Sequence, residues 1–183
     1  MRPVLLLIFA LWLAGQVPNA ELERLYRQDQ ADREDFDKHL GDQKWFAALP
    51  ERDAARLARI REMARKGELQ CPKDYSRAAL ILQHGAMPDD FLLAHVLSTA
   101  AAIGGESDAK WLSAATLDRY LQKIGQPQIF GTQYSFQDKN PWTMEPYHED
   151  LLTDGWRKLY GVPGLVEQKK QLDEIRRESK ENK

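Results

Sequence analysis

The sequence predicts an all-α fold: a compact bundle of about six or seven helices with one long ordered loop over residues 126–146. Three observations support this prediction. Apolar residues recur at helical spacing along most of the chain that follows residue 20. Prolines and glycines fall where these segments are expected to start and end. No stretch of alternating apolar and polar residues suggests a strand-rich region.

The chain has 183 residues, enough for one globular domain with one core. A formal net charge of −2 argues against a nucleic-acid partner that is attracted by an overall positive field. The single cysteine, Cys71, excludes an internal disulfide framework and a multi-cysteine zinc site. No His-x-x-x-His or His-x-x-Glu pair is present that would preorganise two metal ligands on one helix. We therefore expect no metal, no cofactor and no nucleic-acid partner.

Residues 1–20 have the features of a secretory signal peptide. Arg2 and the amino terminus are positive, and the apolar run Val4–Ala14 follows them. This run is shorter than the roughly 20 residues that a membrane-spanning helix needs. A small residue, Ala20, places the cleavage after position 20, and no cysteine is present there for a lipid anchor. The pattern predicts a secreted or periplasmic protein with no membrane span after cleavage, a single domain over residues 21–170 and a polar, frayed tail over 171–183.

Five helices are predicted before the long loop. Their ranges are 21–39, 50–67, 76–84, 88–103 and 107–124. The first is highly charged and has only a narrow apolar stripe. Pro50 is placed in the first turn of the second helix, and Gly67 ends it. Asp74 or Ser76 is the expected cap of the third helix, and Gly125 is the stop of the fifth.

The segment 126–146 breaks the helical pattern with prolines, Gly131 and four aromatic residues. A loop of roughly 20 residues is long for a compact domain, and such loops are usually functional or disordered. Its aromatic content indicates that it packs against the helices. Two further helices are predicted after it, over residues 148–160 and 162–180.

Helical geometry singles out two polar residues of the fifth predicted helix. At about 100° per residue, Asp118 lies on the core-facing arc between Ala114 and Trp111. A buried carboxylate without partners is costly, so Asp118 is expected to have them. Arg119 projects about 100° away, so the two side chains hold different elements or different parts of one ligand. His95 shares a stripe with Ser98 and Thr99, which predicts a solvent-facing side chain.

Several short blocks resemble a bacterial family, the domain of unknown function numbered 6624. The blocks are Gln83-His84, Gly105-Glu106, Trp111-Leu112, Asp118-Arg119 and Gly125–Gln133, with Arg27–Gln30 and Arg33 upstream and Trp156–Pro163 downstream. The resemblance covers roughly residues 27–166. It implies a compact helical domain that is often exported, and it implies no activity.

Two hypotheses explain the polar residues. The first is a pocket for a small polar ligand, formed by residues that converge near the loop: His84, Glu106, Asp118, Arg119, Gly131, Thr132 and Gln133. In this hypothesis His84 acts as a general acid or base oriented by Asp118, and Arg119 meets an anionic group, as in a hydrolase or lyase. Gly131 allows close backbone approach, while Thr132 and Gln133 supply donors and acceptors.

The second hypothesis is that the same residues anchor the loop to the helices. Asp118 then accepts loop N–H groups, Arg119 donates to loop carbonyls and Gln133 satisfies others. Function then lies in a surface, and the protein is a binding or interaction module of the cell envelope with an envelope protein as partner. Trp142, Tyr147 and Trp156 are the candidate contact residues. We favour this hypothesis because it accounts for each residue without a ligand.

Overall fold

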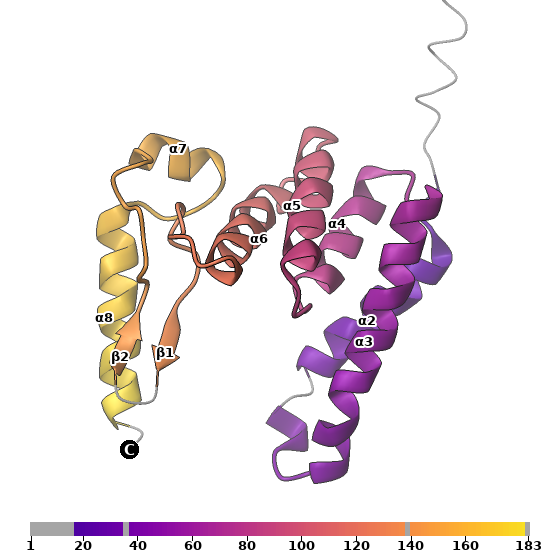
Figure 1. Cartoon of the computed structure of the whole chain (residues 1–183), viewed down its shortest axis with the longest axis horizontal. Coiled ribbons are helices and arrows are strands. Elements are labelled where there is room, and N and C mark those ends of the chain that lie inside the picture. The colour runs from indigo at the N-terminus through magenta and orange to yellow at the C-terminus, as the bar shows by residue number, and fades with distance from the viewer. Residues whose placement is uncertain (1–16, 35–36, 138–139, 182–183) are drawn as a thin grey trace, which may run out of the picture.

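A computed structural model describes residues 17–34, 37–137 and 140–181. In these ranges the chain forms seven α-helices, a short 3₁₀ helix and a two-stranded sheet (Figure 1). The helices are α2 (Ala20–Glu34), α3 (Gln43–Lys66), α4 (Pro72–Leu82), α5 (Pro88–Ile103), α6 (Ala109–Lys123), α7 (Asp154–Leu159) and α8 (Leu165–Glu181). The strands are β1 (Ser135–Gln137) and β2 (Asn140–Thr143), and η2 spans Asp37–His39. The mostly helical fold class is confirmed.

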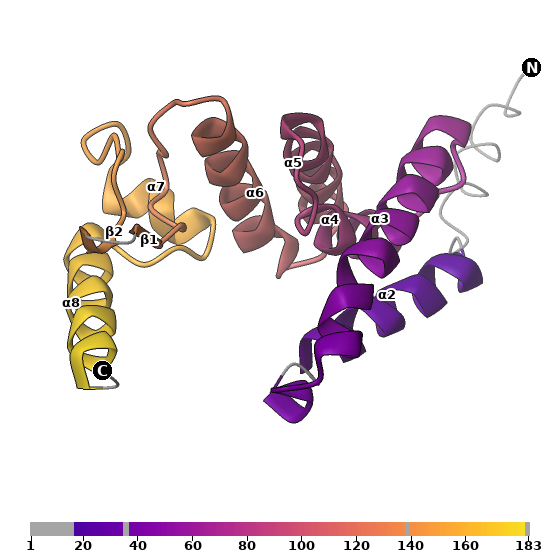
Figure 2. The same ribbon diagram turned by 60° about the horizontal axis from the view of Figure 1, so that its bottom comes forward.

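The elements lie side by side in nearly the order in which they occur in the chain (Figures 1 and 2). The helices α2 and α3 are at one end, α4, α5 and α6 are in the middle, and the hairpin, α7 and α8 are at the other end. The main core lies between α2, α3, α4 and α5, where Leu22, Ile60, Met63 and Leu82 are fully buried. A second, smaller core forms where the loop meets α6. The two cores separate the predicted site residues into two groups.

The second predicted helix starts earlier than expected. Asp42 caps α3, because its carboxylate accepts the backbone N–H groups of Lys44 at 3.1 Å and Trp45 at 3.0 Å. Pro50 therefore lies inside α3, not in its first turn. The end of the helix is as predicted, since Gly67 takes the left-handed conformation at φ 70°.

The third helix also starts earlier. α4 begins at Pro72, and Asp74 does not cap it, because the Asp74 carboxylate binds the backbone N–H groups of Asn19 and Gln70. Helices α5 and α6 follow the predicted ranges closely. A left-handed Gly125, at φ 73°, follows α6 as expected.

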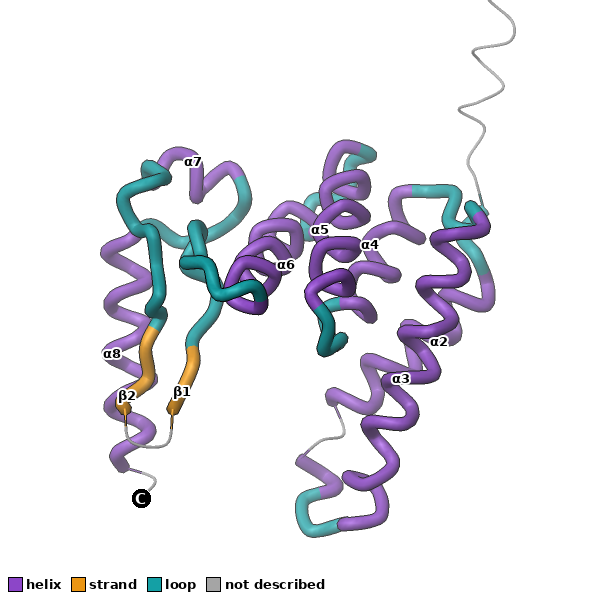
Figure 3. Tube along the Cα trace, in the orientation of Figure 1, coloured by secondary structure: helices purple, strands orange, loops and turns teal. Residues whose placement is uncertain are grey.

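The segment after α6 differs from the prediction in two ways: the predicted loop contains two strands, and the helix predicted after it is shorter (Figure 3). Residues 126–146 include the antiparallel hairpin of β1 and β2, with Ser135 opposite Thr143, whereas the sequence suggested no strands. The helix predicted over 148–160 is reduced to α7. The carbonyls of Glu149 and Leu152 accept hydrogen bonds from the Arg157 side chain, which takes the place of helical backbone bonds there.

The carboxyl-terminal part is ordered further than predicted. α8 continues through Glu181, so the expected boundary at residue 170 and frayed tail from 171 are corrected. Leu172 is buried, and the Nε of Arg176 donates to the carbonyl of Trp142 at 2.8 Å, which ties α8 to β2. Among the described helices, none has the length and apolar character needed to cross a membrane.

Candidate functional site

Asp118 joins α6 to the loop. It is 0% exposed, and both of its carboxylate oxygens accept hydrogen bonds from loop residues. Oδ1 accepts the backbone N–H groups of Ile129 at 2.8 Å and Phe130 at 3.0 Å. Oδ2 accepts the backbone N–H of Thr132 at 3.0 Å and its hydroxyl at 2.7 Å. These are the contacts that the anchoring hypothesis predicts, and they leave the carboxylate little capacity to orient a histidine or a ligand.

Gln128 and Gly131 close the same loop on itself. Gln128 is fully buried, its Nε2 donates to the carbonyls of Gln133 and Met144, and its Oε1 accepts the Gln133 N–H at 3.0 Å. Gly131 has φ 78°, and a Cβ there would lie 2.5 Å from Gln168 Oε1. Only glycine fits this position, because the backbone is left-handed and the space is already filled. Gly131 therefore serves loop packing.

A second network holds the loop from the other side. Arg157 is 1% exposed, and its Nη1 and Nη2 donate to the carbonyls of Leu152 and Glu149, each at 2.6 Å. Its Nε donates to the Tyr147 hydroxyl at 3.1 Å, and that hydroxyl donates to Gln168 Oε1 at 2.9 Å. Burial raises the pKa of Tyr147, although the Arg157 hydrogen bond opposes the rise.

Sequence reasoning did not predict this network. Arg157 stands between two exposed residues, Trp156 and Lys158, in a charged segment that resembles a solvated helix face. Of the three candidate contact residues, Trp156 is exposed on α7, whereas the Tyr147 hydroxyl is held inside the network. Trp142 is half-buried and contacts the Phe136 ring.

His84 is not part of the Asp118 cluster. Its Nδ1 lies 3.0 Å from Oδ1 of Asp29, a fully buried residue of α2, and its side chain is 21% exposed. The α2 end of the molecule and the loop lie on opposite sides of α5 and α6 (Figure 2). The predicted convergence of His84 with Asp118 is therefore wrong. The motif blocks that contain Asp29 and His84 meet instead, although 55 residues separate them in sequence.

Charged residues of α2 and α3 surround Asp29. Arg56 is almost fully buried, and its Nη2 donates to Asp32 and Asp53, each at 2.6 Å. Arg33 binds both oxygens of Asp53 at 2.9 Å. Burial alone would raise the pKa of Asp32, but hydrogen bonds from Arg52 and Arg56 more than reverse this and lower it. Arg56 Nε is buried without a hydrogen-bond partner and lies 3.8 Å from Asp29 Oδ1. Asp29, Asp32 and Asp53 are nevertheless balanced in charge by Arg33, Arg52 and Arg56, so the cluster has no surplus charge for a ligand.

Two other residues considered in the sequence analysis, Glu106 and His95, lie where α5 meets α6. Glu106 is half-buried in the turn between these helices, where its backbone bonds Ala101 and Ala109. Its side chain joins neither Asp118 nor His84 among the described contacts. His95 was expected to face solvent, but its Nδ1 lies 2.9 Å from the Ser113 carbonyl and links α5 to α6. The stripe that contains His95 and Ser98 faces inward, because Ser98 is also buried and its hydroxyl donates to the Ala94 carbonyl at 2.8 Å.

Arg119 differs from each of these residues. It is half-buried on α6, and its Nε is buried without a hydrogen-bond partner. Within the described ranges no carboxylate pairs with its guanidinium and no loop carbonyl accepts from it, so its predicted role as a loop donor is wrong. Burial lowers the pKa of Arg119. The Nε2 of the loop residue Gln133 donates to Thr132 Oγ1 at 2.9 Å and to the carbonyl of Ala115 at 3.4 Å, and Ala115 lies one turn before Arg119 on α6.

The described residues contain no group of three or more His, Cys, Asp or Glu side chains arranged to hold a metal ion. Comparison of the chain with protein-family models, with curated proteins and with solved structures gives no match. The resemblance to the helical bacterial family therefore stays a sequence-based prediction. Among the predicted site residues, Arg119 is the one with a buried side-chain nitrogen that has no hydrogen-bond partner in the described ranges.

Proposed function

We propose that the protein is an exported binding module of the cell envelope that receives an anionic group at Arg119. One observation carries the proposal: the guanidinium is half-buried, its Nε has no acceptor, and no described carboxylate neutralises it. Taking a charge out of water without a partner costs free energy. An anion that binds there recovers this cost, so the ligand-free protein is poised to bind one.

The surroundings of Arg119 indicate what kind of anion fits. A guanidinium offers a planar fork of N–H donors that matches a carboxylate or a phosphate. The amide N–H groups of the loop residue Gln133 donate to Thr132 and to Ala115, one turn before Arg119, and no described residue donates to the Oε1 of Gln133. That oxygen is available to a ligand hydroxyl or amine. We infer a small anion that also carries a hydrogen-bond donor, such as a hydroxy acid, an amino acid or a sugar phosphate.

The anchored loop supports this site by fixing its shape in advance. Asp118 and Gln128 hold residues 128–133 through bonds that need no ligand. A rigid wall reduces the ordering that binding must impose, which favours affinity. In this proposal the anchoring and pocket hypotheses describe two parts of one arrangement: Asp118 shapes the loop, and Arg119 binds.

A thermal-shift screen tests the proposal. The purified mature protein is heated with inorganic phosphate, sulfate, hydroxy acids, amino acids and sugar phosphates at constant ionic strength. A ligand at about 100 times its dissociation constant stabilises the fold by about 2.7 kcal/mol. We expect this shift in the wild type, its loss in Arg119→Gln and a partial loss in Arg119→Lys, which keeps the charge but not the fork.

Arg65→Gln is the matched control, because Arg65 is an exposed arginine of α3 that no described residue pairs with. It removes the same charge and should keep the ligand response. If no anion shifts the wild type, or if the shift persists in Arg119→Gln, Arg119 is not the binding group.

A second candidate function is proton transfer by His84. The observation in its favour is the contact between His84 Nδ1 and the buried Asp29 carboxylate, which orients a partly exposed imidazole. A screen of chromogenic esters, phosphates and glycosides tests it. Hydrolysis by the wild type that disappears in a folded His84→Gln variant supports this function. Hydrolysis that is unchanged in His84→Gln refutes it.

A further inference from the structure

Asn19 lies at the junction between the predicted leader and α2, and it is built into the fold. Its Oδ1 accepts the backbone N–H groups of Glu21 at 3.0 Å and Leu22 at 3.1 Å, which caps α2. Its own N–H donates to Asp74 Oδ1 at 2.9 Å, and its Nδ2 donates to the Glu68 carbonyl at 3.3 Å. One residue thus joins the start of α2 to both ends of the α3–α4 connection.

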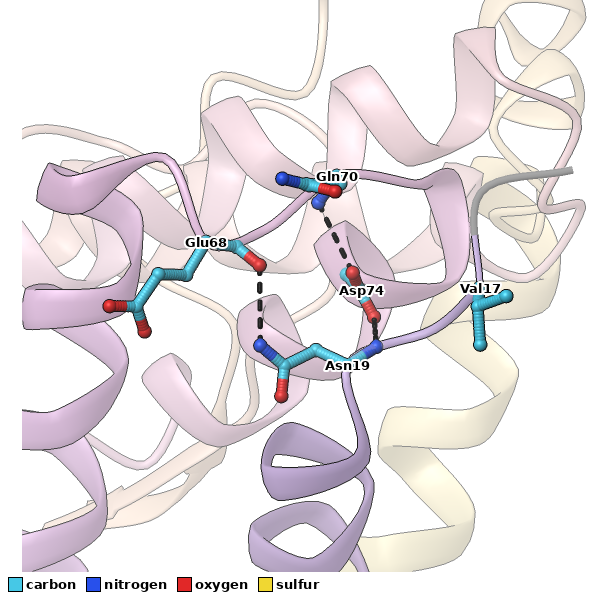
Figure 4. A pocket seen from close by; sticks show the side chains of 5 residues that line it. All are labelled: Val17, Asn19, Glu68, Gln70 and Asp74. Atoms are coloured by element: carbon cyan, nitrogen blue, oxygen red, sulfur yellow. Dashed lines mark hydrogen bonds between the residues drawn. The ribbon is translucent and has the colours of Figure 1, made fainter.

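These contacts form one wall of a pocket of about 260 Å³ (Figure 4). Its lining residues are Val17, Asn19, Glu68, Gln70 and Asp74. In Figure 4 Asn19 lies between the Glu68 carbonyl and the Asp74 carboxylate, and Val17 lies on the side away from Glu68. Asp74 is 1% exposed, and its other oxygen accepts the Gln70 N–H at 3.1 Å. Asn19 therefore supplies one of the two backbone donors that satisfy a buried carboxylate.

Cleavage after Ala20 would remove this residue. The Glu21 and Leu22 N–H groups would lose their cap, and Asp74 would keep only the Gln70 donor. A buried acceptor left without its partner destabilises a fold more than the bond itself stabilises it. A processing site after Ala20 thus conflicts with the contacts of the folded domain.

We propose that the leader is removed on the amino-terminal side of Asn19, at the Gly15–Gln16 bond, so that the mature protein begins at Gln16. Gly15 is a small residue directly after the apolar run Val4–Ala14, as a leader-cleaving peptidase requires at the position before the cut, and Leu13, smaller than Trp12, stands third from this bond. Cleavage one residue earlier would place the bulky Trp12 third from the bond. Water adds across the peptide bond, leaving a carboxylate on Gly15 and a free amine on Gln16.

This inference rests on the predicted leader and is independent of Arg119. The full chain is expressed in a bacterium that exports proteins, and the mass and amino-terminal sequence of the secreted product are measured. We expect a product that begins at Gln16, with or without loss of ammonia by cyclisation of that glutamine. A product that begins at Glu21, or one that keeps the leader, overturns the proposal.

Two matched variants locate the bond. Gly15→Gln places a long side chain before the proposed cut, and we expect the precursor to accumulate. Ala20→Gln makes the same change at the alternative bond, where the side chain is exposed at the start of α2, and we expect normal processing. The reverse pattern, with Ala20→Gln blocked and Gly15→Gln processed, refutes the assignment.

A stability measurement checks the structural premise separately. Asn19→Ala should lower the melting temperature of the secreted protein by roughly 4 °C, because the cap and a partner of Glu68 are lost. Val17→Ala is the control, since Val17 is 85% exposed and should change it little. Equal melting temperatures for the two variants would refute the premise that Asn19 belongs to the folded domain.

Discussion

Asp118 binds Thr132 through two hydrogen bonds to the same carboxylate oxygen, one from the backbone N–H at 3.0 Å and one from the hydroxyl at 2.7 Å. The other oxygen binds two more loop N–H groups, so four donors converge on one fully buried carboxylate. Charge-assisted bonds of this kind are stronger than neutral ones. The loop conformation is thus set by a residue of α6 before any ligand arrives.

Loss of the Asp118 carboxylate should destabilise the fold strongly. We expect Asp118→Ala to lower the free energy of unfolding by about 3 kcal/mol, because three backbone N–H groups lose their buried acceptor. Thr132→Val removes the hydroxyl, which donates to Asp118 and accepts from Gln133 Nε2, and should cost about 2 kcal/mol, about 1 kcal/mol for each bond. Urea denaturation measures both.

Asp150→Ala serves as the control for that series, because Asp150 is exposed and has no partner among the described residues. It should change stability by less than about 0.5 kcal/mol. An Asp118→Ala variant as stable as Asp150→Ala would show that the loop does not depend on this carboxylate.

Alanine substitutions at Gly131 and Gly125 distinguish the free-energy cost of backbone strain from that of overpacking. Both have positive φ, 78° and 73°, but an added Cβ meets Gln168 and Tyr147 at Gly131 and nothing within 4 Å at Gly125. Gly125→Ala should cost about 1 kcal/mol, from the left-handed backbone alone. Gly131→Ala adds overpacking and should cost about 3 kcal/mol. Thermal unfolding compares the two, and equal losses would mean that the loop yields to the added methyl group.

The sequence predicted those elements whose ends carry strong local signals. Pro88 and Gly125 mark the start of α5 and the stop after α6, and both predictions agree with the structure. The prediction that the second helix starts near Pro50 was wrong. Asp42 caps α3 earlier in the chain, and a proline is tolerated inside a helix that tertiary contacts stabilise. The hairpin was not predicted because each strand is too short to show a clear alternation of apolar and polar residues.

The site was predictable where helical geometry alone decides burial. The angle of Asp118 on α6 placed it on the buried face, and its partners followed from the need to satisfy a carboxylate. The partner of His84 was not predictable, because Asp29 is distant in sequence and lies in a highly charged helix in which the sequence does not distinguish a buried acid from the exposed ones. The buried Arg157 was missed for the same reason, since only tertiary contacts distinguish it from an exposed arginine.

Asp32 should make stability depend on pH in the acid range. Its pKa is lowered in the folded state by Arg52 and Arg56, so its contribution is present above the unfolded-state pKa of about 3.9. That contribution is lost as the pH falls through the folded-state pKa. Asp32→Asn should therefore cost about 1 kcal/mol at pH 7, and this cost should shrink as the pH falls below about 3.9 toward pH 2.

Chemical denaturation across this pH range tests the Asp32 prediction. Glu34→Gln is the control, because Glu34 is an exposed acid of the same helix with no described ion pair. Its effect should stay small at each pH. A cost for Asp32→Asn that is constant between pH 7 and pH 2 would mean that its ionised form is not what stabilises α2 against α3.

Arg119 should reduce the stability of the ligand-free protein. Its buried Nε has no acceptor, and burial lowers its pKa, which reports that the charged form is disfavoured there. Arg119→Met keeps the aliphatic packing and removes the charge. We expect the free energy of unfolding to rise by about 1 kcal/mol in the absence of anions.

The same substitution should abolish the response to the anion that stabilises the wild type. Arg65→Met, the exposed control, should alter neither stability nor the anion response by more than about 0.5 kcal/mol. A purely structural arginine gives the opposite result, because its removal lowers stability in the presence and in the absence of anions. Urea denaturation of both variants, with and without the ligand found in the thermal-shift screen, therefore separates a binding arginine from a scaffolding one.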